Sequence, residues 1–165
     1  MSSSAPQDFR TFVVARTPAL SRTAFLLTGD AHLAEDLVQT ALFKAAKAWH
    51  RIEGDPEPYV RRILYTQNVS WWRARKVKET SLGSYDAPDA AVDRDLRLTL
   101  EQALARLTTR QRTILVLRYF EDLTEVQTAT ALGITAGTVK STTRHALARL
   151  RALAPELAEL IGEGS

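Results

Sequence analysis

The sequence predicts an all-α protein built from two small helical domains, and three observations support this prediction. Apolar residues recur at helical spacing over most of the chain, and no stretch shows the alternation of a β-strand. Between 79 and 95 the helical pattern stops and the chain gathers Gly, Pro, Ser and four Asp, as is typical of a linker. At 165 residues the chain is long enough for two small cores. We therefore expect domains at 1–78 and 96–165, joined by an acidic linker at 79–95.

The first two helices of the amino-terminal domain meet at a turn. One helix is expected from Asp8 to Leu27, with Pro18 breaking or kinking it because proline lacks a backbone N–H. The second follows the turn at 28–30, with Asp30 as its cap. Its apolar residues recur largely at the helical period: Leu33, Leu37, Val38, Ala41, Phe43, Ala45 and Trp49.

The third helix of this domain combines aromatic and basic residues. It is expected to begin at Asp55, with Pro56 in the first helical position, where a missing N–H costs nothing. At least one of Trp71 and Trp72 is expected in the core, because tryptophan buries a large apolar area. The other core positions are Val60, Ile63, Leu64 and Val69. From 51 to 78 there are seven Lys or Arg against three Asp or Glu. A surface that binds unpaired nucleic acid requires this combination of aromatic rings for stacking and cations.

The carboxy-terminal domain carries the pattern of a helix-turn-helix at 123–150. Thr124 and Gln127 can form a capping box, and Gly133 suits the left-handed residue that ends a helix. Thr135 can cap the second helix, whose inward residues are Val139, Ala146 and Leu150. Four Lys or Arg and no acidic residue lie in 136–154. The alternative is a capped helical hairpin with a solvated basic face.

Two helical segments precede this motif in the carboxy-terminal domain. The first covers 96–107, and the second follows a capping box made by Thr108 and Gln111. Arg112 and Arg118 on the second segment are candidates for phosphate contacts, and a solvated helix surface explains them equally well.

Composition excludes several classes of function. The absence of cysteine excludes disulfides and thiol chemistry, and three scattered histidines do not form a zinc site, so no metal or cofactor is expected. No apolar stretch approaches the roughly 18 residues of a membrane span, and the start lacks the features of a signal peptide. We therefore expect a cytoplasmic protein without membrane insertion. The net charge of +3 gives only modest overall attraction to DNA, so the two basic segments carry more information.

Three segments, in this order, resemble the extracytoplasmic-function (group IV) sigma factors of the sigma-70 family. GDAHLAEDLVQTALFKAAKAWHRI is similar to the polymerase-binding helix of that family, and PEPYVRRILYTQNVSWWRAR to its promoter-melting and minus-ten segment. LTTRQRTILVLRYFEDLTEVQTATALGITAGTVKSTTRHALARLR is similar to its minus-35 domain, and AEDLVQ and GTVKS are the sharpest matches. The Ala- and Arg-rich chain looks closest to the short actinobacterial SigE-like group. The resemblance implies a promoter-specificity subunit that recruits RNA polymerase and opens promoters, and not an enzyme.

The resemblance also implies a site for core RNA polymerase on the second helix. Spacings of three and four place five candidate residues on one polar side of that helix: Glu35, Asp36, Gln39, Thr40 and Lys44. From spacing alone an ordinary solvated face is the stronger interpretation, and the resemblance reverses that preference. The expected partners are the beta-prime clamp helices and the beta flap of the polymerase. Many relatives are held inactive by an anti-sigma factor, which makes such a protein a candidate partner.

Two sets of residues are expected to bind promoter DNA. The minus-ten set is Arg51, Tyr59, Arg62, Thr66, Trp72, Arg73 and Arg75, with Arg61, Tyr65, Trp71 and Lys76 as further groups on the same helix. The loop at 50–57 either wraps a flipped base or simply connects two helices. The minus-35 set is Lys140, Ser141, Arg144, His145 and Arg149.

The chain departs from the family pattern at a few positions. Thr128 stands where an aliphatic core residue is usual, and Thr142 and Thr143 replace a common Arg-Leu pair. Thr66 stands where many relatives carry Asn. These departures bear on the DNA sequence preference and leave the expected fold unchanged.

Two other classes of function compete with the sigma factor. The first is a stand-alone helix-turn-helix transcription regulator whose amino-terminal domain senses a ligand or dimerises. The second is a small nucleic-acid enzyme, which requires clustered carboxylates, a Gly-rich phosphate loop or a cysteine nucleophile, and the sequence shows none of these. The aromatic and basic third helix discriminates against the regulator, because binding to duplex DNA alone does not need it.

Overall fold

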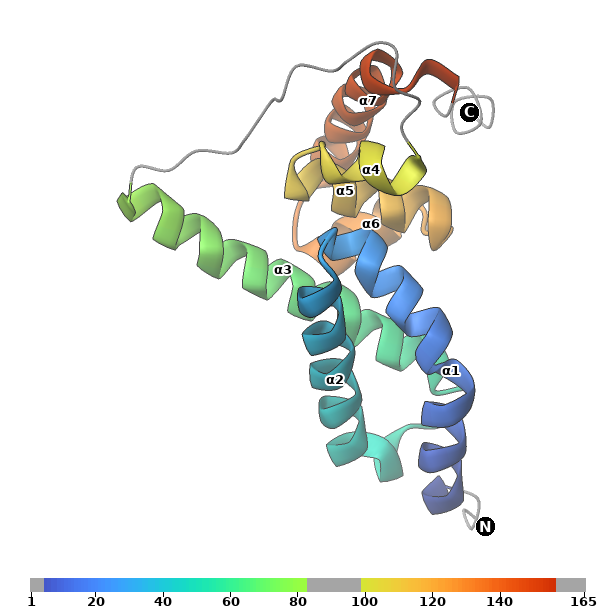
Figure 1. Ribbon diagram of the computed structural model, residues 1–165. Coiled ribbons are helices and arrows are strands. Elements are labelled where there is room, and N and C mark those ends of the chain that lie inside the picture. Colours follow the sequence, from blue (N-terminus) through green and yellow to red (C-terminus); the bar gives the residue numbers. More distant parts are fainter. Residues whose placement is uncertain (1–4, 83–98, 157–165) are drawn as a thin grey trace. The chain divides into compact units, whose positions relative to one another are not determined.

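All regular secondary structure in the part of the chain described by the computed structural model is helical (Figure 1). That part comprises the backbone of 5–82 and 99–156 and the side chains of 9–74 and 99–156. Most of the predicted linker, and the carboxy-terminal tail from 157, lie outside the described residues. The chain separates into two compact units, 1–73 and 74–165, and each is described by itself.

The amino-terminal unit is formed by α1 and α2, the 3₁₀ turn η1 and the first part of α3. Their bounds are Ala5–Thr28 for α1, Ala31–Ala48 for α2, Trp49–Arg51 for η1 and Glu57–Leu82 for α3. Helices α1 and α2 pack side by side as a hairpin (Figure 1). Gly29 takes the left-handed conformation at the bend, and the Asp30 carboxylate accepts hydrogen bonds from the N–H groups of His32 and Leu33 at 2.8 and 3.0 Å. These contacts confirm the predicted turn and cap.

The sequence predicted a break or kink at Pro18, and helix α1 runs through this residue without a break. Proline removes the hydrogen bond to the carbonyl four residues earlier, which here belongs to Val14. Val14 is 76 % exposed and Pro18 is exposed as well. Water can therefore hydrate the carbonyl that the proline leaves without a partner, which lowers the cost of continuing the helix.

The core of this unit lies along one side of α2, and Phe43 is not part of it. Leu37, Ala41 and Ala45 are fully buried, whereas Phe43 is 62 % exposed. Phe43 is therefore the member of the apolar series that does not follow the helical period of the buried residues. It lies two residues from both alanines, and a two-residue step in a helix leads to the opposite side. At the end of α2 the core is closed by Trp49, whose ring lies 5.0 Å from that of Phe9.

Helix α3 begins at Glu57, whose N–H donates to the Asp55 carboxylate at 3.0 Å, so the start lies two residues after the predicted one. It continues to Leu82, past the point at which the linker was expected. Val60 and Leu64 are fully buried, as predicted. Trp71 and Trp72 are each only partly buried, so the prediction that one of them lies in the core is wrong. Both stand within three residues of the end of the unit, where fewer neighbours cover a side chain.

The carboxy-terminal unit contains the predicted helix-turn-helix, preceded by three short helical segments. Its elements are α4 (Leu100–Ala105), α5 (Thr109–Leu115), the π-helical turn η2 (Val116–Phe120), α6 (Glu125–Leu132) and α7 (Ala136–Leu153). Residues 96–98 of the first expected helix lie outside the described part, and α4 begins with a capping box of Thr99 and Gln102 that the sequence interpretation missed.

Local signals at the helix ends are confirmed throughout this unit. Capping boxes open α5 and α6 at Thr108 and Thr124, and the Thr135 hydroxyl accepts the N–H of Thr138 at the start of α7. Gly133 ends α6 in the left-handed conformation, with φ of 69°. The inward residues of α7 are buried as predicted: Val139, Ala146 and Leu150. Together these caps fix the turn that orients α7.

None of the helices in the described part is both long and apolar enough to cross a bilayer.

Candidate functional site

Five exposed residues form a stripe along one side of α3, here called the α3 stripe: Tyr59, Arg62, Thr66, Ser70 and Arg73. Their spacings of three and four place them on one face of the helix. Tyr59 is 41 % exposed, and the Thr66 hydroxyl donates within the helix to the carbonyl of Arg62 at 3.0 Å. Ser70 was missed by the sequence interpretation, although it lies four residues after Thr66, just as Thr66 lies four residues after Arg62. The stripe therefore offers an aromatic ring, two small hydroxyl residues and two guanidinium groups along one line.

The remaining residues expected at the minus-ten element do not share this stripe. Trp72 is partly buried and lies on a different side of α3, and Arg51 is exposed in η1. The side chain of Arg75 lies outside the described residues, as does that of Lys76. Tyr65, offered as a stacking platform, is only 6 % exposed and belongs to the core.

Arg61 is also removed from the candidate surface, because it is engaged inside the unit. Its Nε donates to the Glu57 carboxylate at 3.0 Å, and its Nη1 donates to the Thr23 hydroxyl at 2.9 Å. Arg16 of α1 donates to the same carboxylate. Partial burial disfavours the charged form of Glu57, but hydrogen bonds and charge from Arg16 and Arg61 outweigh it and hold the pKa below its ordinary value of 4.5. This cluster fastens α1 to the beginning of α3.

A second exposed surface lies on α2 and is here called the α2 face: Glu35, Asp36, Gln39 and Phe43. Three of these were predicted, and the Gln39 amide donates to the Glu35 carboxylate at 3.5 Å. The two other predicted residues are less available to a binding partner. Thr40 is partly buried, and the Lys44 ammonium donates to the amide oxygen of Gln67 on α3 at 2.5 Å.

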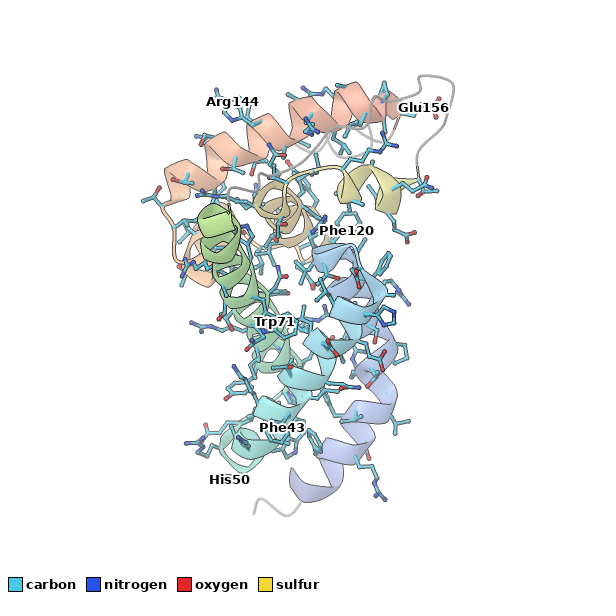
Figure 2. The ribbon with its side chains drawn as sticks, turned by 60° about the vertical axis from the view of Figure 1, so that its left-hand side comes forward. Phe43, His50, Trp71, Phe120, Arg144 and Glu156 are labelled. Carbon is cyan, nitrogen blue, oxygen red and sulfur yellow. The ribbon has the colours of Figure 1, made fainter. Side chains whose placement is uncertain are left out.

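Phe43 gives the α2 face an apolar residue that the sequence interpretation missed. Figure 2 shows the labelled ring on α2, where 62 % of the residue is exposed. The Lys47 ammonium lies 4.5 Å from the centre of this ring, within the range of a cation–π contact. Aromatic residues are enriched in protein-binding surfaces, so the exposed ring marks the α2 face as a candidate surface of this kind.

The third surface lies on α7. Lys140, Arg144 and His145 are exposed, and Ser141 is partly buried with its hydroxyl donating to the Thr138 carbonyl at 3.2 Å. Figure 2 shows Arg144 on the outer side of α7, away from α4 and α5. Four of the five predicted minus-35 residues thus lie on the side of α7 that is open to a ligand.

Arg149, the fifth predicted residue, points toward α4. Its Nε and Nη2 atoms each lie 3.4 Å from the carbonyl oxygen of Arg106, which is the C-cap residue of α4. A cation at this place satisfies a free carbonyl at a helix end. The geometry therefore gives Arg149 a part in holding α7 to α4.

Two further arginines are engaged within the unit as well. Arg112 is only 7 % exposed, and the Arg118 guanidinium donates to the Leu123 carbonyl at 2.7 Å and lies 4.0 Å from the Glu125 carboxylate. The alternative that either one contacts phosphate is not supported by this placement.

Thr128 is fully buried, and its hydroxyl has no hydrogen-bond partner among the described residues.

No group of three or more His, Asp or Glu side chains in the described part is arranged to hold a metal ion. What the described surfaces offer instead is charge, an aromatic ring and hydrogen-bond donors. Such groups can bind macromolecules.

Comparison with known proteins accounts for both units. Sigma-70 region 2 matches residues 8–77, and sigma-70 region 4 matches residues 103–152. The RNA polymerase sigma-E factor of Streptomyces coelicolor is 40 % identical over 149 residues, covering 87 % of this chain and 84 % of its own length. The ECF RNA polymerase sigma factor SigL of Mycobacterium tuberculosis is 36 % identical over 154 residues, with 84 % of each chain covered.

A solved structure has a similar fold. It is the sigma factor RpoE from Bartonella quintana, in complex with the anti-sigma factor NepR. It matches with a TM-score of 0.64 at 27 % identity, covering 89 % of this chain and 96 % of that one. With regions 2 and 4 in order and relatives at 40 % identity, the chain belongs to the sigma-70 family, as an extracytoplasmic-function sigma factor of the sigma-E type.

Proposed function

We propose that this chain is the promoter-specificity subunit of a bacterial RNA polymerase. It binds core polymerase through the α2 face, recognises the minus-35 element through α7, and captures unpaired minus-ten bases along the α3 stripe. It performs no covalent chemistry and acts in the cytoplasm, where its polymerase works. The relatives named as RNA polymerase sigma factors support this proposal.

The α3 stripe is the observation that carries the proposal. Holding unpaired bases requires a flat ring for stacking and cations along the backbone, and Tyr59, Arg62 and Arg73 supply these groups on one face. A regulator that binds only duplex DNA has no use for a second basic surface in another unit. An anti-sigma factor is the expected regulatory partner, since the related RpoE was solved with one.

The stripe is tested by transcription from two templates, using the chain reconstituted with Streptomyces core polymerase on a promoter that this holoenzyme itself initiates from. One template is fully paired, and the other is mismatched across the minus-ten region. Tyr59→Ala and Arg62→Ala should lose activity mainly on the paired template, because the mismatch removes the unstacking cost that these residues offset. Arg22→Ala, which removes an exposed arginine of α1, should behave as wild type on both. Equal losses on both templates would contradict the role in opening.

The α2 face is tested by binding to core polymerase in the absence of DNA. Phe43→Ala should weaken the complex by about 2 kcal/mol or more if the ring is a central anchor. Val14→Ala is the control, because Val14 is an apolar residue on α1 that is even more exposed than Phe43. Neither change removes a buried side chain, so helix content should stay constant. Unchanged binding by Phe43→Ala would exclude the ring as an anchor of this surface.

A further inference from the structure

Gly137 is a glycine of α7 that the fold itself does not require. It is the second residue of the helix, and it is not among the glycines with positive φ, which are Gly29, Gly54 and Gly133. A Cβ placed on Gly137 would meet only the Thr135 hydroxyl oxygen, at an ordinary 3.9 Å. Because glycine weakens a helix relative to alanine, alanine would serve this position better on grounds of stability alone.

Gly137 lies on the face of α7 that carries the candidate DNA-binding residues. The residue is exposed and lies three, four and seven residues before Lys140, Ser141 and Arg144, on the same side of α7. The first residues of a recognition helix are those that come nearest to the base edges in the major groove. Glycine is the residue that lets a backbone approach a ligand closely.

We propose that Gly137 is a positioning residue that sets how closely α7 approaches promoter DNA, with the main chain at this point packing directly against the duplex. This inference rests on the proposed function, because it takes the duplex as the ligand of α7. A methyl group at Gly137 holds the helix back from the groove by roughly 1 Å, enough to stretch hydrogen bonds of 2.7–3.2 Å beyond their useful range. Base-edge bonds are lost in this way, whereas long cationic side chains still reach the phosphates.

The test uses the full chain reconstituted with Streptomyces core polymerase and two duplex probes. One probe is enriched from a random 30-base-pair library by the wild-type holoenzyme, and the other is the unselected library. Gly137→Ala should bind the enriched duplex about tenfold more weakly, with affinity for the unselected library within about twofold of wild type. Its thermal stability should equal or exceed that of wild type. Ala152→Leu adds more bulk to an exposed position about 22 Å further along α7 and should leave both affinities unchanged.

Several results would overturn the inference. These are full discrimination by Gly137→Ala, an equal loss on both probes, a loss of stability in Gly137→Ala, or an equal loss in Ala152→Leu. Failure of the proposed function looks different, because the wild-type holoenzyme would then enrich no sequence at all. A wild type that discriminates, beside a Gly137→Ala variant that discriminates equally, removes only the role of Gly137.

Discussion

Replacing Thr128 by valine should stabilise the carboxy-terminal unit. Thr128 is fully buried in α6, and its hydroxyl finds no partner among the described residues. A buried hydroxyl without a hydrogen bond has lost its contact with water and gained nothing in return. Valine has nearly the same shape and is also β-branched, so it adds neither a cavity nor a change in helix propensity beyond a few tenths of a kcal/mol.

The expected gain in the free energy of unfolding is about 1–2 kcal/mol, from the typical cost of an unsatisfied buried hydroxyl. For a unit of this size, such a gain raises the melting temperature by roughly 4–16 °C. The effect should be confined to one unit, because Thr128 lies in the segment 74–165.

The chain offers two probes that separate its units. All three tryptophans, Trp49, Trp71 and Trp72, lie in the segment 1–73, so their fluorescence reports the unfolding of the amino-terminal unit. Circular dichroism at a helix wavelength reports both units. Thr128→Val should shift the dichroism transition upward and leave the fluorescence transition in place.

Thr28→Val is the matched control, since Thr28 is buried as well but its hydroxyl donates to the Ala24 carbonyl at 2.9 Å. That variant should lose about 1 kcal/mol and lower the fluorescence transition. If Thr128→Val instead destabilised the protein, its hydroxyl must have a partner, and the reasoning from an unsatisfied group would fail.

Two further variants test structural roles assigned to charged residues. Glu57→Gln should lower the stability of the amino-terminal unit by about 1–2 kcal/mol at pH 7, because the two arginines then donate to a neutral amide oxygen in place of a charged carboxylate. The pKa of Glu57 is held below 4.5, so this difference in stability from wild type should be complete above about pH 5 and should shrink as the pH falls through the lowered pKa. Unfolding followed by fluorescence measures it. A difference in stability that stays constant down to about pH 2 would refute the role of the Glu57 charge. Arg149→Ala should cost up to about 1 kcal/mol of stability and leave the slope of log affinity against log salt unchanged, since its guanidinium serves the Arg106 carbonyl. A slope reduced by about one unit in duplex binding would instead make it a phosphate contact.

The sequence predicted best those features that depend on a few neighbouring residues. The cap at Asp30, the boxes at Thr108 and Thr124 and the left-handed Gly133 each involve partners within four residues, and all four are confirmed. Helix propensity and capping act locally, so the printed order of residues contains the necessary information. The order of the helices followed from these signals.

The fate of individual arginines was not predictable in the same way. Arg61 binds Thr23, which is 38 residues away, and Arg149 reaches a carbonyl 43 residues away. Only the packing of separate helices brings such pairs together. Composition therefore identified basic segments correctly and could not separate cations used inside the fold from cations left for a ligand.

The structure makes that separation, and it sharpens the proposed interface. Arg62, Lys140 and Arg144 are exposed, and their charged groups have no ion pair or hydrogen bond within the part of the chain that is described. A cation that no internal acceptor holds retains its full capacity for phosphate or a base edge, whereas an engaged one must first give up its partner. The partner-free cations on α3 and α7 are therefore the residues at which substitution should weaken promoter binding with little effect on folding. By the same argument, substitution of Arg61 or Arg118 should affect folding first.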